Sequence, residues 1–307
     1  MRERAVSFGR DNSLIGVLTQ PDDFDPDDGV LLWMDAAMEH RIGPHRLYVD
    51  LSRYLAEQGV ASFRFDFPGV GDSEYATERR SVRPDSKSRL ASAVESLATR
   101  PDGQPERRRG YPSQVVASID AMNYLRDHFD CNQFTLAGIC AGADYAHAAA
   151  VADDRVNGVI MLDGFGYRTT KYYWHYYWPR LRNPRRWLNL LQRYLQKIQQ
   201  KLGMRDSTPA KRLDEAGFRN MPTQQQVEAD LPKLVDRKVD LFYVYTGELQ
   251  EYYSYEEQFY DMLPSIDFGM CLTLQYLKAA DHSFEVPSAR EDLERRLAQW
   301  FHRRRSE

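Results

Sequence analysis

The chain alternates short apolar runs with longer segments whose apolar residues recur at helical spacing. The apolar runs include VLLWMDAA, VASFRFDF, QFTLAGI, VNGVIMLDGFG and VDLFYVYTG. Continuous apolar runs of this length are typical of strands that are buried on both faces. In PHRLYVDLSRYLAEQG, Leu47, Leu51, Tyr54 and Leu55 share one helical face. Strands alternating with helices predict an α/β domain with a mostly parallel central sheet and helices on both of its faces.

The two ends of the chain add further elements. ERAVSFG and SLIGVLTQP flank RDN and predict an amino-terminal β-hairpin. A helix is expected at roughly 112–129, another near 254–263, and a last one over SAREDLERRLAQWFHRR, preceded by the strand-like CLTLQYLKAADHSF.

Two segments interrupt the alternation. Residues 75–110 are polar and rich in arginine, which predicts a surface insertion within the core. Residues 167–235 are aromatic and basic, and they predict a helical lid insertion. The core domain is therefore expected to comprise 1–166 and 236–307.

Composition narrows the class of protein. The 307 residues are 42% hydrophobic and 28% charged, with a net charge of −4, as in ordinary globular proteins. No apolar run approaches the roughly 20 residues that span a bilayer, and the first residues lack the apolar core of a signal peptide. We therefore expect a cytoplasmic protein with thiol cysteines. Cys131, Cys140 and Cys271 show no metal-ligand spacing, and we expect neither a metal nor a cofactor.

The stretch LAGICAGAD places Cys140 between Gly138 and Gly142, where a strand passes into an alanine-rich helix. A nucleophile at a strained strand-to-helix turn requires small neighbours, and a helix N-terminus favours the thiolate. The spacing alone is equally compatible with a buried structural cysteine at a close strand–helix crossing.

The combination of motifs resembles the α/β-hydrolase family over most of the chain, apart from the insertions. GICAGAD stands in the place of G-x-S-x-G, with cysteine at the serine position as in dienelactone hydrolases. DFPGVGDS is similar to the turn after the fourth strand of that fold. MDAAMEHRIGPHRLYVDLSRYLAEQG and MLDGFGYRT resemble exosortase-associated hydrolases of the serine-aminopeptidase type, although DAA replaces the usual N-A-G.

The resemblance implies a histidine base after the last strand, where AADHSFEVP contains His282. The remaining histidines fit that position less well: His40, His45, His128, His147, His175 and His302.

The third member of a triad is an acid that orients the imidazole. The resemblance places it in the loop after VDLFYVYTG, at Gln250 by the commonest spacing. Glu251 is the favoured candidate, with Glu248 as its main competitor. Asp163 is the third, because some relatives take the acid from the end of the preceding strand.

An oxyanion hole needs two backbone N–H groups aimed at the developing negative charge. The resemblance implies Ala141, directly after the nucleophile, and Met38 or Ala37 in the loop after VLLWMDAA. The alternative is that DAAM is only the end of a strand.

The predicted lid begins with KYYWHYYWPR, and its Tyr172, Tyr173, Trp174 and Trp178 are candidate substrate-binding residues. Nine lysines and arginines and no acidic residues lie in 171–205. A lid closing over the active site explains this pattern most simply. The basic segment could alternatively dock an acyl carrier protein or, less favourably, an anionic membrane surface. No nucleic-acid-binding motif accompanies it.

Together these features predict an acyl hydrolase or acyl transferase, thioesterase-like, that acts on a small-molecule ester or thioester through an acyl-cysteine. The alternative is a non-catalytic binding or scaffold protein on the same fold, since fold does not fix function.

Overall fold

The computed structural model describes residues 1–36, 39–74, 111–181, 219 and 221–306. Its eight strands form one sheet in the order β1-β2-β4-β3-β5-β6-β7-β8. The strands are β1 (Arg2–Phe8), β2 (Leu14–Gln20), β3 (Val30–Met34), β4 (Ala61–Phe65), β5 (Phe134–Ile139), β6 (Val156–Leu162), β7 (Asp240–Thr246) and β8 (Leu272–Leu277). The predicted surface insertion at 75–110 lies outside the described residues, as does most of the predicted lid.

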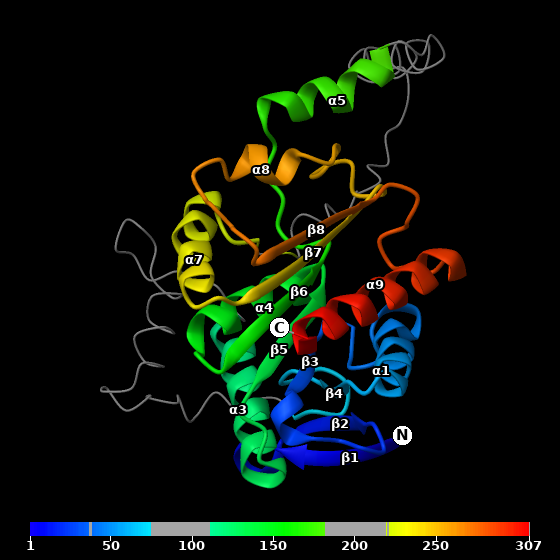
Figure 1. The fold of residues 1–307 in the computed structure, drawn as a ribbon, viewed down its shortest axis with the longest axis vertical. Coiled ribbons are helices and arrows are strands. Elements are labelled where there is room, and N and C mark those ends of the chain that lie inside the picture. Colours follow the sequence, from blue (N-terminus) through cyan, green and yellow to red (C-terminus); the bar gives the residue numbers. More distant parts are fainter. Residues whose placement is uncertain (37–38, 75–110, 182–218, 220, 307) are drawn as a thin grey trace, which may run out of the picture.

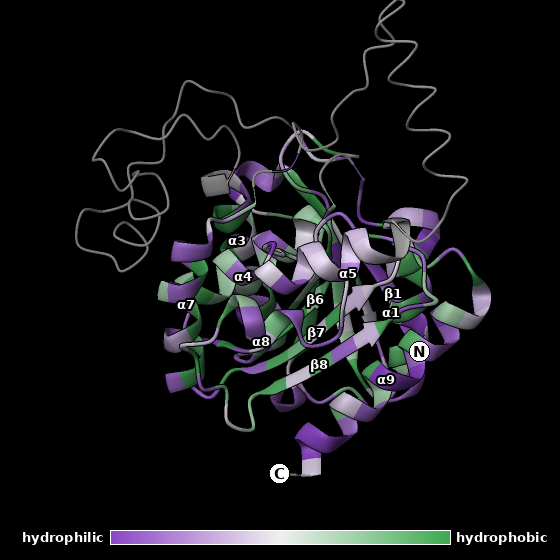
Figure 2. Ribbon diagram, turned by 90° about the horizontal axis from the view of Figure 1, so that it is seen from above, coloured by the Kyte–Doolittle hydropathy of each residue, from purple (hydrophilic) through white to green (hydrophobic). Residues whose placement is uncertain are grey.

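The sheet confirms the predicted α/β class. β1 and β2 form the expected antiparallel hairpin, β2 also pairs antiparallel with β4, and every other pairing is parallel. All residues of β3, β4 and β5 are buried, as their continuous apolar runs predict. β8 is an edge strand whose residues are all half-buried, and Figure 2 shows hydrophilic positions along it.

Helices cover both faces of the sheet (Figure 1). The apolar residues of α1 and α9 form one buried cluster with Leu31 and Trp33 of β3. Those of α3, α4 and α7 form the other cluster, with Leu32 and Met34 of the same strand. The helices are α1 (Leu47–Glu57), α3 (Tyr111–Phe129), α4 (Ala141–Ala152), α5 (Thr170–Leu181), α7 (Gln224–Asp236), α8 (Gln258–Met262) and α9 (Pro287–Ser306).

Two helices differ in length from the pattern that predicted them. His45 and Arg46 have φ of 47° and 63°, so α1 begins only at Leu47, after a 3-10 turn. α8 is a single short helix over Gln258–Met262, because the aromatic residues before it form turns rather than a helix.

Helix α7 lies within the predicted lid segment but packs on the core. Val227, Leu231 and Leu234 are completely buried in the cluster that also contains residues of α4 and the sheet. Thr223 begins the helix with a capping box that it forms with Gln226.

His147 of α4 faces α7 and is almost fully buried. Within the described part of the chain neither ring nitrogen has a hydrogen-bond partner, and Nε2 lies 3.9 Å from Asp230 of α7. Burial lowers the pKa of His147 to about 4, although Asp230 opposes this and Lys233 adds to it. The native state therefore holds this imidazole neutral, at a cost for two unpaired polar atoms.

We expect this histidine to make the protein sensitive to acid. The unfolded pKa of this histidine is about 6.5, so between pH 6.5 and pH 4 the unfolded state binds more protons than the native state. The free energy of unfolding is therefore at its full value above pH 6.5 and decreases as pH falls toward 4. The full loss amounts to at most about 3 kcal/mol. Urea unfolding at pH 7 and pH 4.5 should show a smaller loss for His147→Leu than for the wild type. His302→Leu, which removes an exposed histidine, should keep the wild-type loss; equal losses in all three proteins would contradict the assignment.

Candidate active site

Cys140 lies at the junction of β5 and α4 in a strained backbone conformation. Its φ of 55° and ψ of −121° place a residue with a side chain in the left-handed half of the map, which is uncommon and costly. A Cβ on Gly138 would lie 2.2 Å from the backbone of Gly142, and one on Gly142 would lie 2.4 Å from the Met34 carbonyl oxygen. Only glycine fits at both positions, so the G-x-C-x-G spacing follows from close backbone packing around this turn.

His282 lies in the loop after β8, as predicted. Asp281 shapes this loop by accepting hydrogen bonds from the backbone N–H groups of Glu285 and Val286 and from the Ser283 hydroxyl. The His282 imidazole and the Cys140 thiol lie close enough for each to shift the pKa of the other. The predicted nucleophile and the predicted base are therefore in contact.

The partner of the imidazole on its other side is Asp163. Nδ1 of His282 lies 2.8 Å from Oδ2 of Asp163, whose carboxylate is completely buried. Thr246 donates its backbone N–H to Oδ1 and its hydroxyl to Oδ2, both at 2.7 Å. Asp163 follows β6 directly and has a φ of 51°, which turns its side chain toward the end of β7.

This geometry corrects the expectation that Glu251 or Glu248 orients the imidazole. Glu251 is exposed, and its backbone carbonyl accepts hydrogen bonds from Arg168 and from the Tyr172 hydroxyl. Glu248 accepts the backbone N–H of His282 at 2.6 Å, so it holds the loop rather than the ring. Both lie beyond the turn at Gly247, whereas Asp163 reaches the imidazole from the neighbouring strand.

The contacts shift the two pKa values in opposite directions. Burial raises the pKa of the Cys140 thiol, but hydrogen bonds from His282 and the Ala141 backbone, together with the Arg219 charge, bring it below its ordinary value. Burial lowers the pKa of His282, but its bonds with Asp163 and Cys140 outweigh this and raise it to about 10. The contacts therefore favour the thiolate form of Cys140 and the imidazolium form of His282.

One of the predicted oxyanion donors lies beside the thiol. The backbone N–H of Ala141 is the first of α4 and is directed at the sulfur of Cys140. The other predicted donors, Ala37 and Met38, lie outside the described residues.

The residues on either side of that segment are anchored. Asp35 accepts the backbone N–H of Phe67 at 2.9 Å, and burial raises its pKa well above the ordinary value. Arg41 donates its backbone N–H to Asp66 at 2.7 Å and forms an ion pair with the same carboxylate. The loop after β3 is thus tied to the DFPGVGDS turn after β4.

Tyr48 stabilises the turn at Cys140 through backbone contacts, and the sequence did not predict it as a site residue. Its hydroxyl donates to the Met34 carbonyl at 2.9 Å and accepts the Ile139 N–H at 3.0 Å. It thereby joins the ends of β3 and β5 immediately before Cys140. The sequence offered one indication that Tyr48 is buried, namely its place beside Leu47 at the start of the apolar face of α1.

The candidate substrate-binding aromatics all lie on α5. Tyr172 is buried and holds this helix to the loop after β7, whereas Tyr173, Trp174 and Trp178 have exposed fractions of 49%, 62% and 43%. α5 follows β6, beyond the same end of the parallel strands at which Cys140 follows β5, and it stands apart from the sheet in Figure 1. Tyr172 is therefore a structural contact, and large parts of the other three side chains are exposed.

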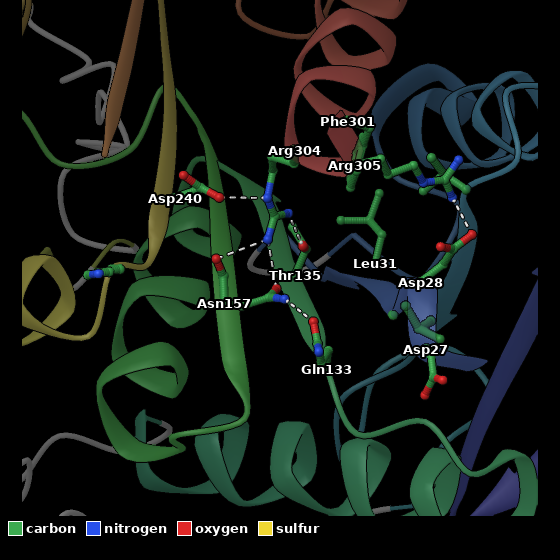
Figure 3. Close-up of a pocket in the computed structure, with 14 residues that line it drawn as sticks. Asp27, Asp28, Leu31, Gln133, Thr135, Asn157, Asp240, Phe301, Arg304 and Arg305 are labelled. Atoms are coloured by element: carbon green, nitrogen blue, oxygen red, sulfur yellow. Dashed lines mark hydrogen bonds and ion pairs between the residues drawn. The ribbon is translucent and has the colours of Figure 1, made fainter. Parts of the chain in front are cut away.

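A cavity of about 340 Å³ lies at the amino ends of β3, β5, β6 and β7, the ends opposite to the one where Cys140 follows β5 (Figure 3). Its central Arg304 is paired with Asp240, Thr135 and Asn157. These charged groups are already satisfied within the chain, so we do not assign the cavity to the reaction. Among the described residues no cluster of side chains could hold a metal ion, and no helix is long and apolar enough to cross a membrane.

No protein-family model matches the sequence, and neither does any curated protein. Solved structures do match it. The α/β hydrolase GrgF from Penicillium sp. sh18 is 15% identical, with 99% of each chain covered and a TM-score of 0.54. An α/β serine hydrolase homologue from Coxiella burnetii is 13% identical, with 97% of each chain covered and a TM-score of 0.51. Est1E from Butyrivibrio proteoclasticus, solved with ferulic acid bound, is 13% identical, with 96% of each chain covered and a TM-score of 0.51. The chain therefore has the α/β-hydrolase fold that its motifs predicted.

Proposed function

We propose that the protein is an acyl hydrolase or acyl transferase that acts on an ester or thioester through a covalent acyl-cysteine. One observation carries this: Cys140, His282 and Asp163 form a continuous row of contacts, with the thiol at a strained turn where a helix begins. A structural cysteine has no need of a histidine partner that is itself fixed by a buried carboxylate.

The reaction follows from the protonation states. The Cys140 thiolate attacks the carbonyl carbon, and the oxygen that gains negative charge lies near the Ala141 N–H. The C–X bond then breaks, and the leaving alcohol or thiol takes the imidazolium proton from His282. Neutral His282 next removes a proton from water, an alcohol or an amine, which attacks the acyl-cysteine. Collapse of that intermediate returns the thiolate and the imidazolium.

The substrate side of the proposal depends on α5. Tyr173, Trp174 and Trp178 expose large apolar surfaces on the reactive side of the sheet, which suits a bulky or long apolar acyl group. Two structural neighbours, an esterase domain from a Rhodothermus marinus protein and Est1E, fit the same class of ester chemistry. Docking of an acyl carrier protein on the basic segment remains a proposal, because most of that segment lies outside the described residues.

Intact-mass spectrometry with a panel of acyl thioesters and esters tests the function. We expect an added mass equal to one acyl group, located on the peptide that contains Cys140. A protein that binds these compounds without any adduct or turnover would instead support the non-catalytic alternative.

Asp163→Asn should lower turnover by about tenfold to a hundredfold. This is less than the roughly 10⁴-fold known for the equivalent change in a serine triad, because a thiolate–imidazolium pair depends less on the acid. Loss of the buried negative charge also removes the main group that raises the pKa of His282. The alkaline limb of the rate profile should therefore move to lower pH.

Two matched substitutions complete that experiment. Glu251→Gln should leave turnover unchanged, because the side chain is exposed and its backbone makes the contacts. Glu248→Gln should have a small effect, since an amide oxygen can still accept the His282 N–H. A large loss of turnover in Glu251→Gln, together with unchanged turnover in Asp163→Asn, would show that the orienting acid is Glu251 in the loop after β7.

A further inference from the structure

Arg219 lies between the two elements that carry the reactive groups. Its guanidinium pairs with the carboxylate of Asp144, with Nε at 2.8 Å from Oδ2 and Nη2 at 3.0 Å from Oδ1. Nη1 donates to the backbone carbonyl of Asp163 at 3.2 Å. Asp144 is in the first turn of α4, four residues after Cys140, and Asp163 is the partner of His282.

These contacts are buried. The Arg219 side chain is 13% exposed and that of Asp144 only 1%, so the pair is screened little by solvent. A two-bond pairing with a carboxylate fixes the plane of the guanidinium and therefore the direction of its remaining N–H groups. One of these reaches the Asp163 carbonyl, which needs such fixing because the residue has a φ of 51°.

The backbone of Asp163 is held on both sides. Its N–H donates to the Val244 carbonyl at 2.8 Å, and its carbonyl accepts from Arg219. The side chain between these bonds is thereby aimed at Thr246 and His282. The positive charge of Arg219 also lowers the pKa of the Cys140 thiol.

We propose that Arg219 is a positioning residue of this site, which fixes the backbone of Asp163 and holds a permanent positive charge beside Cys140. The inference deepens the proposed function and rests on it only in that Cys140 acts as a thiolate. It assigns a role to a residue of the predicted lid segment that no motif indicated.

The test follows the rate of Cys140 alkylation by iodoacetamide against pH, read by mass spectrometry of the Cys140 peptide. No acyl substrate is involved. Arg219→Gln should move the midpoint of this profile up by about one pH unit, a tenfold loss of thiolate below it. Arg219→Lys keeps the charge although it cannot make all the planar contacts, so we expect a nearly unchanged midpoint.

Arg237→Gln is the matched control. Arg237 also binds backbone carbonyls of α4 and the β6 region, those of Ala150, Asp153 and Val156, but at the far end of both elements. Its loss should leave the midpoint unchanged. If the role of Arg219 is purely structural, the alkylation midpoint of Arg219→Gln should stay at the wild-type pH, like that of Arg237→Gln.

Arg219→Gln leaves Asp144 buried without its partner, which can prevent folding. The double variant Arg219→Gln/Asp144→Asn removes both charges and keeps two amides that can pair. The reference for this double variant is Asp144→Asn, which differs from it only in the charge of Arg219. A higher midpoint in the folded double variant than in Asp144→Asn supports the inference, and equal midpoints overturn it. If the midpoint rises while thioesters leave no adduct on the wild type, the proposed function fails and the role of Arg219 stands.

Discussion

Cys140→Ala is expected to abolish both acyl-adduct formation and turnover. The substitution removes the sulfur that pairs with His282, while a methyl group occupies the same turn without strain beyond that already present. Intact mass after incubation with an acyl thioester should then equal that of the unmodified protein. Thermal unfolding is the control for folding, and it should show a transition at least as high as that of the wild type.

Cys140→Ser separates the nucleophile from its surroundings. The hydroxyl has a much higher pKa than the thiol, so it relies on removal of its proton by His282 during attack. We expect weak hydrolysis, because the Ala141 N–H and the His282–Asp163 pair remain. Full turnover in Cys140→Ala would show that another residue carries the reaction and would end the acyl-cysteine mechanism.

The positions of Cys140 and His282 in the fold could be predicted because each depends on local sequence. The glycines around Cys140 are required by backbone contacts shorter than any side chain allows, so the spacing itself encodes the turn. His282 follows the last strand of an alternating pattern, and the strand order that brings it to Cys140 belongs to the fold.

The acid could not be chosen by spacing, because it depends on how two loops lie across neighbouring strands. β6 and β7 pair in parallel with Leu162 opposite Val244, which sets Asp163 beside the end of β7. Thr246 can then donate twice to its carboxylate. A positive φ at Asp163 completes the approach, and no sequence pattern reports that angle. The adjoining Asp-Gly after an apolar strand was the one visible hint.

Arg219 illustrates a further limit. It lies more than seventy residues from Asp144 and more than fifty from Asp163 along the chain. The residues around it, LDEAGFRNMP, form no recognisable motif. Only the fold shows that this arginine pairs with the buried carboxylate of Asp144 in α4.

His282→Ala should lower the chemical step by at least the roughly 10²–10⁴-fold typical of general acid–base catalysis. It should also move the alkylation midpoint of Cys140 to higher pH, because burial then raises the thiol pKa against weaker opposition. Both effects have one cause, the loss of the imidazolium that pairs with the thiolate. His45→Ala, which removes an exposed histidine, is the control and should leave both unchanged.

The pH profile of the wild type gives an independent view of the same pair. The reactive form needs Cys140 ionised and His282 protonated, so kcat/KM should rise through a pKa below the ordinary thiol value and fall near pH 10. A plateau across neutral pH is the expected result, since the two pKa values are shifted apart. In His282→Ala the alkaline fall should disappear, because no imidazolium remains to lose its proton. If turnover and the profile are unchanged in that variant, the base lies elsewhere, and His40 in the loop after β3 is the next histidine to replace.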